Sequence, residues 1–388
     1  MKKTALFLVL GLCAVCASAA ETKIGPRGQV IVNGKAVVPL GVWSQPGYLF
    51  EYYRRLGMTC IIGADEERQD FRGPVGAAEA ATASNLGLIV DTGRFRGGAG
   101  HPAVWGRLGG VLAGRGGGRM RGGPGGPPRG DPNHFLMVNI AIRSFLDGRN
   151  AESFAQALRG TDAVISHVWP ECMEPNRPNL RNVATFVDLV RKYCKDRPGG
   201  EVCIWPDINP HGWTLKKEEG STAFPPPTPP ELRFQIWLAL IHGADGICFF
   251  PISFEPMFVY AQIPARNEQE LAWNSRLIER MTPALTAEES PLKIAVTSDQ
   301  KDGILDWTTR TVGGKHYVFL LNGQRQEQTV TVQVPAPADG WQLRDAVADK
   351  PAALTAGRLA EKLPGLALRI WELAPPQAAP AGATRPAK

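Results

Sequence analysis

The sequence predicts an α/β fold, a (β/α)8 TIM barrel followed by a small all-β sandwich. The first observation is a repeated unit of one helix and one buried strand, which is clearest at residues 228–254. The second is length, because residues 21–289 provide the roughly 250 residues that a closed barrel of eight such units needs. The third is a change of pattern after Pro291, where short strands follow one another without helices.

The clearest unit starts at a helix N-terminus. Thr228 and Glu231 have the spacing of a capping box, and prolines occupy the first helical turn. Apolar residues at positions 232, 236 and 240 form one apolar face, and Gly243 ends the helix. Residues 247–250 are then apolar without interruption, which is typical of a parallel strand covered on both faces.

The other elements follow in chain order. Residues 28–41 predict a β-hairpin that turns at Asn33-Gly34, a strong signal for a two-residue turn. Barrel strands are expected at residues 39–43, 58–63, 86–90, 101–105, 135–140, 163–169, 202–206 and 247–250. Helices are expected at residues 48–56, 76–85, 151–158, 228–243 and 268–285, with one more that carries Val183, Val187 and Val190 on one face. Right-handed crossovers favour closure, and the alternative, a doubly wound open sheet, lacks a glycine fingerprint after the first strand.

The segment 94–130 breaks this pattern where a helix should cover the fourth strand. Residues 92–130 contain no Asp or Glu, about seven arginines and about 16 glycines. Such a composition cannot bury enough apolar surface to offset the entropy of ordering. The segment is either a genuine disordered insertion or partly a frame-shifted or otherwise corrupted stretch of coding sequence, and the abrupt loss of acidic residues favours the second hypothesis. The nucleotide sequence across residues 91–131 decides between them.

The charge of the chain is concentrated in that segment. The formal net charge is +6, and without residues 92–130 it falls to about −1. An RGG-like tract that binds nucleic acid is a third interpretation of the segment, but it has little purpose in a secreted barrel. We therefore expect no nucleic-acid partner.

Both ends of the chain have recognisable patterns. Residues 1–20 resemble a secretory signal peptide, with Lys2 and Lys3, an apolar stretch, and a small-residue cleavage site at Ala17-Ser18-Ala19. The apolar stretch is too short to span a membrane, and no later segment qualifies. We expect a secreted or periplasmic protein without a membrane span, with the sandwich at residues 290–374 and a disordered Pro/Ala-rich tail at 375–388.

Five of the seven cysteines lie after the expected signal peptide, and an odd number argues against a full disulfide framework. Cys60, Cys203 and Cys248 lie in apolar strand-like runs and are expected to be free, buried thiols. No Cys or His spacing matches a zinc site. We expect neither a metal nor a cofactor, and the oligomeric state stays open.

The expected active site lies at the C-terminal ends of the barrel strands. Carboxylates, large aromatic rings and two residues of the long loop 207–227 gather there: Trp43, Asp65, Asp91, Trp169, Glu171, Asp207, His211, Trp213 and Glu255. Sugars stack their C–H faces on aromatic rings, and glycoside hydrolysis uses two carboxylates, about 5 Å apart for retention or roughly 6.5–9.5 Å apart for inversion. Asp207 and Glu171 are the candidate catalytic pair, and the other residues are candidates for substrate binding.

Structural interpretations compete with these roles. Asp207 precedes a loop and is a common turn residue. Glu171 and Glu255 fit ordinary solvated or structural charges. Trp43, Trp169 and Trp205 all fit a barrel core, and for Trp205 this interpretation is favoured. His242, at the opposite end of the barrel, fits a cation at a helix C-terminus.

Three stretches carry a resemblance to a known family: QVIVNGKAVVPLGVWSQPGYLFEYYRRLGMTCIIG, HPAVWG and PPELRFQIWLALIHGADGICFF. They resemble glycoside hydrolases of the β-galactosidase-like barrel clan (clan A), and the sandwich is similar to the C-terminal domain that such enzymes often carry. The resemblance covers most of residues 28–373. It implies a β-linked glycan, an acid/base glutamate after strand four and a nucleophilic glutamate at the end of strand seven.

The sequence departs from the clan at both catalytic positions. No carboxylate follows HPAVWG before Asp131, and the residue near the end of strand seven is Asp207, one methylene shorter than glutamate. Two hypotheses follow. The first is a secreted glycoside hydrolase-like protein that acts on a β-linked oligo- or polysaccharide through Asp207 and Glu171. The second is a non-catalytic carbohydrate-binding protein on the same barrel.

Overall fold

The computed structural model describes residues 21–63, 76–91, 100–112, 134–140, 158, 160–170, 179–195, 200–217, 220–254, 257–335 and 340–375. Side chains are described over the same ranges except 110–112 and 213–223. The expected signal peptide, most of the Gly/Arg-rich segment 94–130, the expected helix before residue 158 and nearly all of the expected tail lie outside these ranges.

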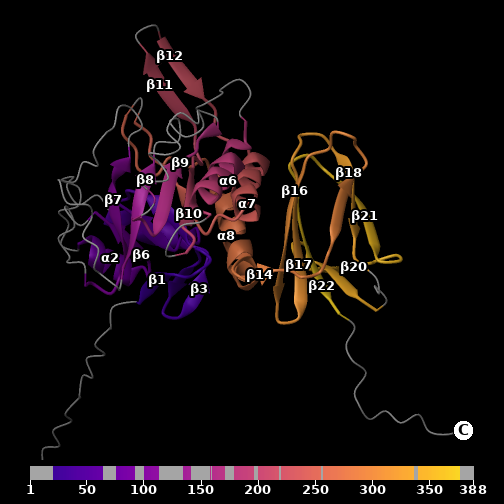
Figure 1. The fold of residues 1–388 in the computed structure, drawn as a ribbon. Coiled ribbons are helices and arrows are strands. Elements are labelled where there is room, and N and C mark those ends of the chain that lie inside the picture. Colours follow the sequence, from indigo (N-terminus) through magenta and orange to yellow (C-terminus); the bar gives the residue numbers. More distant parts are fainter. Residues whose placement is uncertain are drawn as a thin grey trace, which may run out of the picture.

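Eight parallel strands close into a barrel, as the sequence predicts (Figure 1). In chain order they are β4 (Leu40–Trp43), β5 (Cys60–Ile62), β6 (Gly87–Val90), β7 (Val104–Leu112), β8 (Phe135–Ile140), β9 (Ala163–His167), β10 (Cys203–Ile208) and β13 (Ile247–Phe249). Each strand pairs with the next, and β13 closes the ring between β10 and β4. All C-terminal strand ends therefore meet at one mouth.

The barrel interior is a packed apolar core. Alternate residues point inward, so Cys60 and Ile62 of β5 join the interior cluster while Ile61 faces the outer layer. A three-stranded sheet of β1 (Thr22–Ile24), β2 (Val30–Val32) and β3 (Lys35–Val37) packs against this cluster through the buried Val30. This sheet covers the N-terminal end of the barrel. Its β2–β3 hairpin turns at Asn33 and Gly34, both with positive φ, which confirms the predicted turn.

Helices form the outer layer. Their bounds are η1 (Gly47–Leu49), α1 (Phe50–Arg55), α2 (Ala77–Ala83), α6 (Asn182–Cys194), α7 (Pro229–Ile241) and α8 (Ala265–Leu285). The sequence predicts one apolar face on α7, but the helix is buried on nearly all sides. The reason is that α7 lies between the barrel, α6, α8 and the sandwich. On the sandwich side, the ring of Trp237 stacks on Phe319, with 6.2 Å between the ring centroids.

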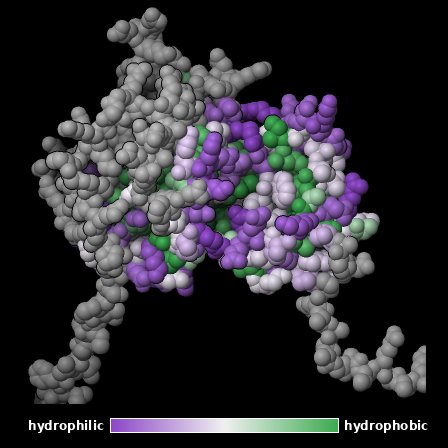
Figure 2. Space-filling view, viewed as in Figure 1, coloured by the Kyte–Doolittle hydropathy of each residue, from purple (hydrophilic) through white to green (hydrophobic). Residues whose placement is uncertain are grey.

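The C-terminal part is an antiparallel sandwich of a six-stranded and a three-stranded sheet, as predicted. The larger sheet contains β14 (Glu288–Glu289), β16 (Leu305–Val312), β17 (Lys315–Asn322), β19 (Gln342–Asp345), β20 (Lys350–Ala352) and β22 (Leu368–Ala374). The smaller sheet contains β15 (Ala295–Ser298), β18 (Gln328–Gln333) and β21 (Arg358–Leu363). Figure 2 shows hydrophilic residues over most of the coloured surface of both parts, with hydrophobic residues in small patches.

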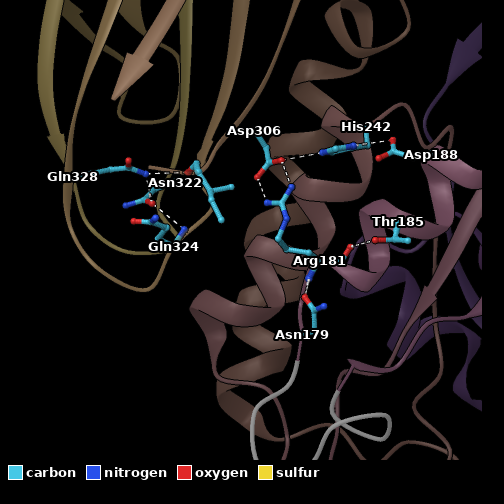
Figure 3. Close-up of polar contacts among 10 residues, drawn as sticks. Asn179, Arg181, Thr185, Asp188, His242, Asp306, Asn322, Gln324 and Gln328 are labelled. Carbon is cyan, nitrogen blue, oxygen red and sulfur yellow. Dashed lines mark hydrogen bonds and ion pairs between the residues drawn. The ribbon is translucent and has the colours of Figure 1, made fainter. Parts of the chain in front are cut away.

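A polar network joins the sandwich to the barrel (Figure 3). Asp306 of β16 accepts two hydrogen bonds from the guanidinium of Arg181, at 2.5 and 2.7 Å. The same carboxylate lies 3.0 Å from Nε2 of His242, whose Nδ1 lies 2.9 Å from Asp188. His242 ends α7, so the expected helix-terminal cation also links the two parts of the chain.

Two regions differ from the sequence-based expectation. The sequence predicts that strand four stops at residue 105, but β7 continues to Leu112, so residues 106–112 of the Gly/Arg-rich segment belong to the barrel. The expected loop 207–227 holds the end of β10 and a hairpin of β11 (Trp213–Lys217) and β12 (Gly220–Phe224). The hairpin projects from the mouth side of the barrel (Figure 1). Across the described ranges, no helix has the length and apolar character to cross a membrane.

Candidate functional site

Polar side chains occupy the last inward positions of three neighbouring strands at the mouth. They are Asn139 on β8, His167 on β9 and Asp207 on β10. His167 and Asp207 are directly opposite in the β9–β10 register. The same inward rows are apolar deeper in the barrel, where Ile165 and Trp205 lie one step below. The polar layer is therefore confined to the end where barrels bind their ligands.

His167 and Asp207 are joined by a hydrogen bond between Nδ1 and Oδ2. On the other side of the ring, Nε2 of His167 lies 3.2 Å from Nδ2 of Asn139. The imidazole is thus held in one orientation by residues on its two neighbouring strands.

Asp207 has no exposed surface, whereas 29% of the His167 side chain is exposed. Burial raises the pKa of Asp207, against the opposing effects of His167 and of the Cys248 thiol on the next strand. The sequence places Asp207 at the start of a loop, but the residue lies within β10. Its carboxylate faces His167, and His167 is the member of the pair that reaches the mouth.

Three large rings surround the His167 imidazole, and we call Trp43, Trp169 and Phe250 the aromatic collar. The ring centroids lie 5.2, 5.1 and 5.3 Å from that of His167, respectively. Trp169 and Phe250 also contact each other, with 4.9 Å between centroids. The collar residues come from the ends of β4, β9 and β13, so closure of the barrel is what brings them together.

Buried hydrogen bonds hold the first collar residue in place. The side-chain amide of Gln45 donates to the backbone oxygen of Trp43 at 2.7 Å and accepts from the hydroxyl of Tyr53 at 2.9 Å. Gln45 has no exposed surface, and Tyr53 is buried in α1. The fixed backbone positions Trp43 before any ligand binds, which lowers the entropy that binding must offset.

His211 lies at the same end of the barrel. Its backbone nitrogen donates to Oδ1 of Asn209 at 2.9 Å, and 2% of the residue is exposed. Burial lowers the pKa of His211, while the backbone of Gly212, Ile252 and Phe250 opposes that shift. This places the imidazole beside the segment after β13, next to the collar.

The structure thus brings together four of the sequence-predicted residues, Trp43, Trp169, Asp207 and His211. Asp91 follows β6 at the same end of the barrel and is half-buried. Trp213 begins β11, and its side chain lies outside the described residues, as do Asp65, Glu171 and Glu255 entirely. Their roles stay predictions.

Sequence reasoning missed His167 and Asn139. A signal for His167 was present, because Ala163, Ile165 and His167 follow the period of two of the inward row of β9. A polar residue in the last inward position of a buried strand is the feature that should have been sought.

Metal binding receives no support from the described residues, among which no cluster of His, Cys, Asp or Glu could hold an ion. Two cavities, of about 470 and 640 Å³, lie away from the mouth. The first contains Arg191, which donates to the backbone oxygen of Gly243 after α7 and pairs with Asp245. The charge of Arg191 thus neutralises a helix C-terminus and a buried carboxylate, which is a structural role. We therefore place the functional site at the mouth.

No protein-family profile and no curated protein matches the sequence. Among solved structures, one titled "Glycoside hydrolase" is 11% identical and has a TM-score of 0.51, and the match covers 91% of this chain and 96% of that chain. A family 39 glycoside hydrolase from Bacteroides cellulosilyticus is 12% identical, with a TM-score of 0.47 and coverage of 89% and 84%. A maltogenic α-amylase from Thermotoga neapolitana is 10% identical, with a TM-score of 0.47 and coverage of 86% and 98%.

At such low identity, structural likeness shows the fold and not the reaction. The barrel, the sandwich and their order along the chain agree with that likeness. The chain therefore has a glycoside hydrolase-like fold, a (β/α)8 barrel followed by a β-sandwich.

Proposed function

We propose that the protein is a secreted, glycoside hydrolase-like protein whose barrel mouth binds a β-linked glycan. The observation that supports this most is the aromatic collar around His167. Sugar rings present apolar C–H faces that stack on aromatic side chains, while their hydroxyls need a few well-placed polar groups. A mostly apolar site with a fixed imidazole at its centre meets both requirements.

Binding is supported more directly than hydrolysis. Hydrolysis needs two carboxylates that reach the scissile bond from either side, and Asp207 is buried behind His167. The barrel strand β7 carries no carboxylate in its sequence, at the place where the clan that the sequence resembles has its acid/base glutamate. We therefore take His167 as the polar group that contacts the sugar, with Asp207 as its positioning residue.

Glycan binding is tested on an array of β-linked oligosaccharides. We expect the wild type to bind, and we expect Trp169→Ala to lose affinity by about tenfold or more, because one face of the collar is removed. The matched control is Trp307→Ala, which removes a ring that is 39% exposed on the sandwich. If the wild type binds no glycan on the array, the proposal is wrong.

Hydrolysis by Asp207 and Glu171 is the second candidate function. It is favoured by the position of Asp207 on β10, the seventh strand of the barrel, where the same clan has its nucleophile. The test is a panel of aryl β-glycosides and polysaccharides with the wild type, Asp207→Asn and Glu171→Gln. Turnover that both substitutions abolish, while glycan binding persists, supports a two-carboxylate reaction. Equal turnover by wild type and Asp207→Asn removes Asp207 from the mechanism.

Secretion is the third part of the proposal, and it rests on residues 1–20. Expression of the full chain in a bacterial host should give a mature protein outside the cytoplasm whose N-terminus lies near residue 21. N-terminal sequencing or intact-mass measurement distinguishes this product from an uncleaved cytoplasmic chain.

A further inference from the structure

The rings of the collar continue outward along the segment that follows β13. The centroid of Phe250 lies 6.1 Å from that of Phe254, and Phe254 lies 5.5 Å from Phe258. Phe258 in turn contacts the buried Tyr260 at 4.8 Å. We call Phe250, Phe254 and Phe258 the aromatic track. It begins at the mouth, since Phe250 belongs to the collar, and it ends against the body of the protein.

The track passes from buried to exposed. Phe250 is 5% exposed and Phe254 46% exposed, and Met257, three residues further along the chain, is 68% exposed. Exposed apolar side chains that gather beside a binding site are unusual on a soluble protein and mark a surface with a ligand. Two such residues so close in the sequence, next to the collar, therefore indicate a surface that binds a ligand.

Backbone hydrogen bonds hold the described residues that flank the track. Ser253 and Val259 exchange two backbone hydrogen bonds of 2.9 Å each, and Gln262 donates to the backbone oxygen of Pro251 at 3.0 Å. Ser253 and Tyr260 are themselves buried. Because this flanking backbone is already paired, a ligand that stacks on the rings orders less of the chain when it binds.

We infer that the aromatic track holds further sugar units of the same glycan whose first unit binds in the collar. The inference rests on the proposed function, and it specifies the substrate class as an oligo- or polysaccharide chain. Continuity supports this occupant, because each ring contacts the next from His167 outward. A protein partner would need roughly 800 Å² of surface on each side, far more than these side chains offer.

The test measures affinity as a function of chain length. The probes are β-linked gluco-, xylo- and galacto-oligosaccharides, each from the monosaccharide to the hexasaccharide, titrated by calorimetry against the full-length protein. For the series that binds, we expect wild-type affinity to rise with length. Phe254→Ala should weaken the hexasaccharide about tenfold and leave the monosaccharide unchanged, since only longer chains reach the track.

Three variants make the outcomes distinguishable. Trp307→Ala, an exposed ring on the sandwich, should change neither affinity, and Phe254→Leu should lose affinity like Phe254→Ala because it lacks an aromatic face. If Trp169→Ala weakens every probe while Phe254→Ala weakens none, the track is overturned and the proposed function stands. If the wild type binds no probe of any length, both are overturned. Thermal melting checks that each variant is folded.

Discussion

At the mouth of the barrel, the buried carboxylate of Asp207 is hydrogen-bonded to His167. Asp207 is fully buried, and burial raises its pKa above the usual value because the charged form is disfavoured. A raised folded-state pKa means that the contribution of Asp207 to stability is complete below its unfolded pKa of about 4. That contribution is lost as the pH rises through the folded-state pKa. The buried charge of Asp207 thus lowers the stability of the fold. Its presence is explained by its role in positioning His167.

The first prediction follows from this direction of the pH dependence. Asp207→Asn keeps the shape of the side chain and an oxygen that accepts from His167, but it removes the buried charge. We expect its free energy of unfolding to rise relative to wild type as the pH increases above the unfolded pKa of about 4, as measured by urea titration. Asp207→Ala is the control, and it should lose about 2 kcal/mol through the unpaired imidazole. An Asn variant that becomes relatively less stable as the pH rises would contradict this.

On the scale of one helix, Glu231 at the N-terminus of α7 has two structural roles: it caps the helix and it forms an ion pair with the sandwich. Its Oε2 accepts from the backbone nitrogen and the hydroxyl of Thr228, both at 2.8 Å. Its Oε1 pairs with Arg325 of the sandwich at 2.7 Å. The capping box predicted from the sequence therefore exists, and it also contacts the second part of the chain.

The second prediction separates these two functions. Thr228→Ala should lower the free energy of unfolding by about 1 kcal/mol, because the helix loses its capping residue. Glu231→Gln keeps a side chain that can cap but loses the ion pair with Arg325, which is 53% exposed, so it should lose less than about 1 kcal/mol. Urea unfolding of both variants gives the order. A larger loss in Glu231→Gln would show that the link to the sandwich dominates.

Elements that bury side chains were predictable, and elements made by backbone pairing alone were not. The buried runs at residues 247–249 and 87–90 read clearly as strands because both faces are covered. The extension of β7 was hidden by its Gly/Arg-rich composition, since its hydrogen bonds to β6 and β8 do not depend on side chains. Gly106 even suits this strand, because a Cβ there would lie 2.7 Å from a ring carbon of Phe135.

The candidate site was predictable only in outline, for a related reason. The barrel rule locates the mouth, and Trp43, Trp169 and Asp207 follow from strand ends. Which of these residues reaches the ligand depends on inward and outward alternation at the last strand position, where a shift of one residue reverses the side chain. The expected loop start at residue 207 therefore hid the fact that Asp207 lies behind His167.

On the scale of the whole molecule, barrel and sandwich are connected by a nearly buried carboxylate. The Asp306 side chain is 5% exposed and bonds both Arg181 and His242. We predict that Asp306→Asn lowers stability by about 3 kcal/mol, because two cations lose a buried partner. In calorimetry, the sandwich and the barrel should then unfold in separate transitions. The exposed Asp302→Asn is the control, and a single unchanged transition in Asp306→Asn would refute the coupling.

The same network predicts a pH dependence. Burial opposes the charge of His242, but hydrogen bonds to Asp188 and Asp306 outweigh it and raise its pKa to about 9. The stabilisation is therefore complete below the unfolded pKa of about 6.5 and lost as the pH rises through about 9. We expect wild type to lose about 2 kcal/mol across this range. His242→Gln should show little change when unfolding is measured at each pH, and an equal decline in both proteins would exclude His242 as the cause.

The buried free thiols of the described residues can report local opening of the fold. Cys60, Cys203 and Cys248 line the barrel interior, and Cys194 lies on α6. A thiol-specific reagent can modify each one only when its own element opens to water. Mass spectrometry of peptides during a labelling time course would therefore measure the labelling rate of each cysteine in the wild-type sequence. Comparing the rate of Cys194 with the rates of the three interior cysteines would show whether α6 opens more often than the barrel interior.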